Sequence, residues 1–129
     1  MQAATDADLM YDARNGIHAG LTAILAWLAF RLGMPDDTFA TSTSFAYMAR
    51  IAPENTWALS FWAAANLGII GLVTTNKVLR LASVLTVATM HGVLAGCLLM
   101  SDGSIWSGTF AVIACMGYYL AYRRARAGI

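Results

Sequence analysis

Charged side chains are scarce in this sequence. Asp, Glu, Lys and Arg make up 12% of the 129 residues, about half of the roughly 25% that is usual in soluble domains. This leaves too little polar surface to cover a globule in water, and the few charges cluster and leave long stretches without any. Because 59% of the residues are hydrophobic, the composition predicts a single integral membrane domain over residues 1–129.

Cysteine, excess basic charge and catalytic motifs are also lacking. The two cysteines, Cys97 and Cys115, both fall in apolar runs, where we expect small buried side chains rather than a disulfide or a metal site. A net charge of +1 without a basic arm argues against a role on nucleic acid. The sequence has no metal-ligand spacing, no plausible Ser-His-Asp grouping and no phosphate-binding glycine loop. We therefore expect no enzyme activity, no metal and no cofactor.

What the sequence does contain is four apolar segments separated by charges. A helix needs roughly 20 apolar residues to cross about 30 Å of hydrocarbon, and these segments lack the alternation that is typical of barrel strands. The sequence therefore predicts an all-α, polytopic transmembrane helical bundle with four spans, at about residues 15–33, 56–75, 80–100 and 104–122. The first segment is short and is bracketed by Arg14 and Arg31. The alternative is three spans plus an N-terminal helix that lies at the interface.

The connections between the segments differ in kind. Residues 75–80 and 101–104 are tight turns, so the last three spans should form successive antiparallel hairpins. The link from Leu32 to Thr56 is longer and contains Pro35 and Pro53. It is either a short amphipathic helix at the interface, which would end at the residue before Pro53, or an irregular loop.

Basic residues near the ends of the spans predict the orientation of the chain. Five of them are expected to set the topology: Lys77, Arg80, Arg123, Arg124 and Arg126. Together with Arg14 they put six basic residues on one side of the membrane, against Arg31 and Arg50 on the other. We therefore expect a multi-pass membrane protein with both termini in the cytoplasm.

Two polar residues lie at the middle of neighbouring spans. Asn66 is near the centre of the second span and His91 is at the centre of the third. A lone amide or imidazole at this depth is costly unless it is hydrogen-bonded. We expect both to face inward and to bond each other, Thr86 or Thr89, or a second subunit. The pair would either hold helices together or, through His91, line a water path.

Small residues recur at four-residue spacing and predict close helix packing. Ala88, Gly92 and Gly96 form the main stripe, on the third span, and Ala64 with Gly68 forms a weaker one on the second. Such stripes let helix backbones approach each other in lipid, where no hydrophobic drive brings helices together. The spacing fits packing within one chain and packing between chains equally well.

Part of the sequence resembles the small multi-span membrane proteins of tailed bacteriophages and prophages, which include holins. The resemblance covers roughly residues 55–124 and is carried by Trp57, Gly68, the basic turn Asn76-Lys77-Val78-Leu79-Arg80-Leu81-Ala82, Trp106 and the run Tyr118-Tyr119-Leu120-Ala121-Tyr122-Arg123. It implies a non-enzymatic protein of the bacterial inner (cytoplasmic) membrane that accumulates in the lipid bilayer, self-associates and opens a lesion.

Two other functions fit the same sequence. The first is an accessory subunit or assembly factor, whose small-residue faces would pack against other membrane subunits. The second is a small channel or carrier that uses Asn66 and His91.

Overall fold

The computed structural model describes residues 2–101 and 105–126, and every element in them is helical. The all-α prediction is confirmed for this part of the chain. The elements in chain order are α1 (Gln2–Leu32), α2 (Thr38–Thr41), the 3-10 helix η1 (Thr43–Phe45), α3 (Ala46–Ile51), α4 (Glu54–Val73), α5 (Lys77–Ser101) and α6 (Ile105–Arg126).

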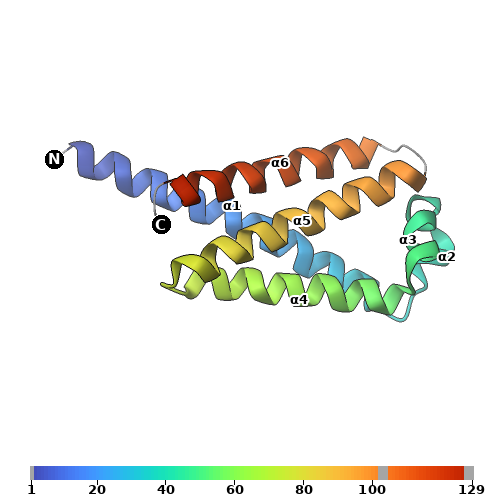
Figure 1. The fold of residues 1–129 in the computed structure, drawn as a ribbon. Coiled ribbons are helices and arrows are strands. Elements are labelled where there is room, and N and C mark those ends of the chain that lie inside the picture. Colours follow the sequence, from blue (N-terminus) through green and yellow to red (C-terminus); the bar gives the residue numbers. More distant parts are fainter. Residues whose placement is uncertain (1, 102–104, 127–129) are drawn as a thin grey trace.

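Four long helices run side by side, and each is antiparallel to the next (Figure 1). α1 packs against α4, α4 against α5, and α5 against α6. The N-terminal part of α1 extends beyond the ends of the other helices (Figure 1). Among the described residues, α4 and α5 are the two helices that are long and apolar enough to cross a membrane.

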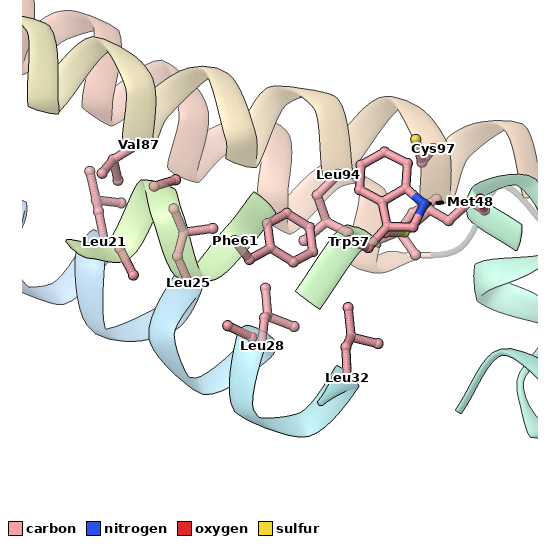
Figure 2. Packing of buried hydrophobic residues seen from close by; sticks show 14 residues of the cluster. Leu21, Leu25, Leu28, Leu32, Met48, Trp57, Phe61, Val87, Leu94 and Cys97 are labelled. Atoms are coloured by element: carbon pink, nitrogen blue, oxygen red, sulfur yellow. Dashed lines mark hydrogen bonds between the residues drawn. The ribbon is translucent and has the colours of Figure 1, made fainter. Parts of the chain in front are cut away.

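The core lies between α1, α4 and α5, and each helix contributes one stripe of residues spaced three or four apart. Figure 2 shows this packing for Leu21, Leu25, Leu28 and Leu32 of α1, Trp57 and Phe61 of α4, and Val87, Leu94 and Cys97 of α5. Such spacing places side chains on one face of a helix. The expectation of two buried cysteines holds for Cys97 and is wrong for Cys115, which is exposed. Cys115 lies on α6, which packs mainly against α5 and leaves most of its circumference uncovered.

The turn between α4 and α5 is as tight as the sequence predicts. α4 ends at Val73 and α5 begins at Lys77. The Asn76 side-chain oxygen accepts a hydrogen bond from the Leu79 backbone N–H at 3.1 Å, as a residue that caps a helix N-terminus does. Most of the second predicted turn, residues 102–104, lies outside the described residues.

The long link folds over one end of the bundle as α2, η1 and α3 (Figure 1). It is helical, but in three short pieces rather than one. Its last helix ends at Ile51, and Ala52 is extended, as the residue before a proline should be. The link is tied down by its contacts with the long helices. Met48 is fully buried, and the Tyr47 N–H donates to Ser101 Oγ at 3.0 Å.

The link is also held by Trp57, whose indole Nε1–H donates to the Met48 carbonyl at 3.0 Å in a buried setting (Figure 2). Replacing Trp57 with Phe removes this donor, while the Met48 carbonyl keeps the Ala52 N–H at 3.1 Å, so the loss is that of one buried hydrogen bond, about 0.5–1.5 kcal/mol. We expect a clearly lower thermal midpoint in detergent, followed by circular dichroism. The matched control is Trp62→Phe, because Trp62 is 52% exposed; equal losses in both variants would contradict the role of this bond.

Candidate functional site

The structure separates the two polar residues that were expected to pair. Asn66 is exposed on the outer face of α4, and its side-chain amide donates to the Trp62 carbonyl of its own helix at 2.8 Å. The expectation that Asn66 faces inward is therefore wrong. Trp57 lies on the inward stripe of α4, and the nine residues from Trp57 to Asn66 make about two and a half turns at 3.6 residues per turn. Asn66 consequently points in the opposite direction.

His91 does face inward and is fully buried. Its Nδ1 lies 2.8 Å from the Val87 carbonyl. Because a carbonyl only accepts, the proton is on Nδ1 and Nε2 carries the lone pair. Nε2 has no hydrogen-bond partner among the described residues, and the ring lies 6.1 Å from that of Phe110. Thr89, one of the two threonines that were expected as partners, is bonded instead to the Tyr118 hydroxyl at 3.1 Å.

A different set of polar residues comes together at the end of the bundle opposite the link. We name Asn15, His18, Arg80 and Arg124 the buried basic cluster. Arg124 Nη1 donates to His18 Nδ1 and Arg124 Nη2 donates to Asn15 Oδ1, both at 3.2 Å. Arg80 Nη2 donates to the same Asn15 oxygen at 3.2 Å. His18 is fully buried, and both arginines are at least nine-tenths buried.

The chemistry of these contacts fixes the form of His18. A guanidinium only donates, so Nδ1 must accept and the proton of the neutral ring is on Nε2. This Nε2–H is buried without a partner among the described residues. α4 completes the site with Gly71, where an added Cβ would overlap the Ser83 side chain and lie 3.2 Å from His18 Cε1. All four long helices therefore meet at the buried basic cluster, which holds them together at this end.

Two of the five residues that were expected to set the topology, Arg80 and Arg124, belong to this cluster and are buried in the bundle. Lys77, Arg123 and Arg126 are exposed at the same end of the bundle. Arg80 lies on the inward stripe of α5, three and four residues before the buried pair Ser83 and Val84. Its side chain therefore leaves the helix on the side that faces the core.

The small residues divide into two groups. Ala64, Gly68 and Ala88 are buried inside the bundle. An added Cβ at Gly68 would lie 2.8 Å from Thr22 Cγ2, and one at Gly117 would lie 2.7 Å from Ala88 Cβ. These positions serve packing within the chain. They allow α1 to approach α4 and α6 to approach α5.

The other group faces outward. A groove of about 510 Å³ runs between α5 and α6, which we name the glycine groove; it is lined by Gly92, Ala95, Gly96, Leu99, Ser107, Gly108, Ala111 and Ala114. An added Cβ at Gly96 or Gly108 would meet nothing within 4 Å. The groove therefore offers a strip of backbone to which another helix can approach closely.

No family model, curated protein or solved structure matches this chain. Its function is therefore inferred from its own residues. Among the described residues, no group of three His, Cys, Asp or Glu side chains could hold a metal ion.

The buried basic cluster was not predicted, because the sequence was used to place each residue along its helix but not to decide which side of the helix the residue faces. Its signal is present in the sequence. Helix α1 has buried residues spaced three or four apart from His18 through Leu21 and Leu25, and the stripe of α6 runs through Leu120 and Ala121 to Arg124. A polar residue in phase with such a stripe is placed inside the bundle.

Proposed function

We propose that this chain is a non-enzymatic, four-span protein of the bacterial inner membrane that self-associates in the bilayer and permeabilises it, as a holin does. The observation that carries the proposal is the glycine groove. It is a strip of mostly small residues on the outside of an apolar bundle, and at Gly96 and Gly108 an added Cβ would meet nothing else in the chain within 4 Å. The orientation follows the basic residues, with both termini in the cytoplasm.

The packing of the helices supports four spans. α4 and α5 are apolar and long enough to cross a bilayer, α1 lies along α4, and α6 lies along α5. α6 has 22 residues, which make a helix of about 33 Å at 1.5 Å per residue. A bilayer that is crossed by the middle pair would therefore be crossed by the outer pair as well.

The outer surface supports the same conclusion. Large apolar side chains are exposed on every long helix, among them Trp27, Phe30, Leu59, Val78 and Val112, each at 60% or more. The buried side chains meanwhile include two histidines and two arginines. Large exposed apolar side chains on all four long helices, with charged side chains inside, support a surface in contact with lipid or with another protein.

Self-association in lipid then depends on close backbone approach, which only small residues allow. Gly96→Leu and Gly108→Leu should each abolish it, because the added side chain occupies the glycine groove, and its Cβ meets nothing in the monomer within 4 Å. The matched control is Ala63→Leu, which adds similar bulk to the exposed face of α4. We expect the two groove variants to lose the timed collapse of membrane potential in expressing bacteria, and the control to keep it.

A native cysteine can be used to detect this contact by crosslinking. Cys115 is exposed on α6, four residues after Ala111 and seven after Gly108, so it shares their face. In a Cys97→Ser background, a thiol-specific crosslinker should join two copies at Cys115, and Gly108→Leu should prevent this. Capture of a heterologous subunit without any dimer of this chain would contradict the proposal and favour the accessory-subunit alternative. A channel built on Asn66 and His91 has less support, because Asn66 points outward.

A further inference from the structure

A second groove lies between α1 and α6 at the basic end of the bundle. Its volume is about 430 Å³, and we name it the α1–α6 groove. Its walls are the apolar residues Ile17, Met116 and Leu120, and its rim carries Arg14, Tyr119 and Arg123. It therefore combines two cationic side chains with an apolar channel on the outer surface of the molecule.

The two arginines at the rim have guanidinium N–H donors that are available to a ligand. Arg123 Nη1 donates to the Tyr119 hydroxyl at 3.2 Å, and its guanidinium carbon lies 5.9 Å from the centre of the Tyr119 ring. This contact orients the group and engages one of its five N–H donors. Arg14 forms no hydrogen bond or ion pair within the part of the chain that the structure describes. Two guanidiniums with free donors suit a phosphate, which they bind with charge-assisted hydrogen bonds.

The groove runs from this charged rim into the apolar zone. Met116 is seven residues before Arg123 on α6, so it lies about 10 Å farther along the helix at 1.5 Å per residue. Ile17 follows Arg14 on α1 in the same direction, because the two helices are antiparallel (Figure 1). A ligand that fits must therefore be anionic at one end and apolar along the other. This is the chemistry of an anionic phospholipid.

We propose that the α1–α6 groove binds an anionic diacyl phospholipid, with its phosphate between Arg14 and Arg123 and one acyl chain along Ile17, Met116 and Leu120. This inference rests on the proposed membrane crossing of α1 and α6. Basic pockets between helices on the cytoplasmic side are where such headgroups bind. A zwitterionic lipid is disfavoured because its cationic headgroup meets no acidic side chain among the lining residues.

The test is native mass spectrometry of the full chain in detergent, with phosphatidylglycerol and phosphatidylcholine of identical acyl chains in competition. We expect a preference for phosphatidylglycerol that falls about fivefold for each arginine removed, and so on the order of 25-fold for Arg14→Gln with Arg123→Gln. The conservative pair Arg14→Lys with Arg123→Lys should keep most of it. The matched control is Lys77→Gln, which removes one charge from the same end outside the groove. Inorganic phosphate tests a free anion, and it should not displace the lipid.

Three outcomes would overturn the lipid site: an unchanged preference in the double glutamine variant, an equal loss in Lys77→Gln, or displacement by phosphate alone. A fourth is a crosslink from the groove to the acidic N-terminal residues of a second copy, which would make the groove an interface between copies. The experiments distinguish failure of the lipid site from failure of the proposed membrane spans. A chain that stays dispersed without detergent would contradict the membrane spans, whereas a detergent-dependent chain with no lipid preference would contradict this site alone.

Discussion

Replacing Gly71 with alanine should destabilise the bundle, although alanine is the better helix former. Helix propensity favours alanine by about 1 kcal/mol. At this position, however, the new Cβ would overlap the Ser83 side chain and approach His18. Ser83 would have to move, which breaks the hydrogen bond from its hydroxyl to the Arg80 carbonyl at 2.8 Å. Overpacking of this kind costs about 1–3 kcal/mol, so we expect a lower thermal midpoint in detergent.

Two glycines of α1 provide the matched control. An added Cβ at Gly16 or Gly20 meets nothing within 4 Å, so alanine there should leave the midpoint unchanged or raise it. Combining Gly71→Ala with Ser83→Gly removes the clashing atoms and should restore most of the lost stability, which a general helix effect would not do. If Gly71→Ala proves as stable as Gly16→Ala, the close approach of α4 to α5 at this point is wrong.

The sequence was sufficient for the features that depend on charge and on strong local signals. The charge-free stretches predicted α4 and α5, two helices that are long and apolar enough to cross a membrane. The polar turn before Lys77 and the bend before Pro53 follow from local chemistry, and both lie where they were expected. The position of these features along the chain needs no tertiary information.

The side of the helix that a residue faces was predicted less accurately than its position along the chain. Ala88 and Gly96 were placed on one stripe because each is four residues from Gly92. Over eight residues, however, the direction turns by about 80° at 3.6 residues per turn. Ala88 is consequently buried against α6, whereas Gly96 faces outward. Asn66 and His91 show the same error, since similar positions along two neighbouring helices do not imply that the residues lie on faces that meet.

The arrangement of the link could not have been predicted from local patterns. Its position depends on partners that are distant in sequence. The Glu54 carboxylate accepts from the backbone N–H groups of Thr38 and Phe39 at 3.3 and 3.2 Å, and Tyr47 is held by Ser101. A short helix gains little from its own hydrogen bonds. Contacts that form only after the bundle assembles therefore decide its place.

Replacing Arg124 with glutamine should cost more stability than any other single loss of charge on α6. Arg124 is 3% exposed and supplies hydrogen bonds to both His18 and Asn15. Glutamine is shorter and cannot reach both, so at least one of the two hydrogen bonds is lost. Asn15 Oδ1 keeps Arg80 as a donor, whereas loss of the bond to His18 leaves its buried Nδ1 without one. Hydrogen bonds of charged groups contribute about 1.5–3 kcal/mol each, and an unsatisfied buried group adds its desolvation cost. We expect a loss of about 3 kcal/mol or more, measured by thermal unfolding in detergent.

The neighbour Arg126 gives the matched control, because it is exposed and its guanidinium carbon lies 5.3 Å from the centre of its own helix's Tyr122 ring. Arg126→Gln removes the same charge from the same turn and should change stability by about 0.5 kcal/mol or less. A second comparison separates hydrogen bonding from charge. Adding His18→Leu to Arg124→Gln removes the acceptor that the first change leaves without its donor, so the double variant should lose less than the sum of the two single losses. Strictly additive losses would mean that Arg124 and His18 stabilise the bundle independently, and that the buried basic cluster does not act as one unit.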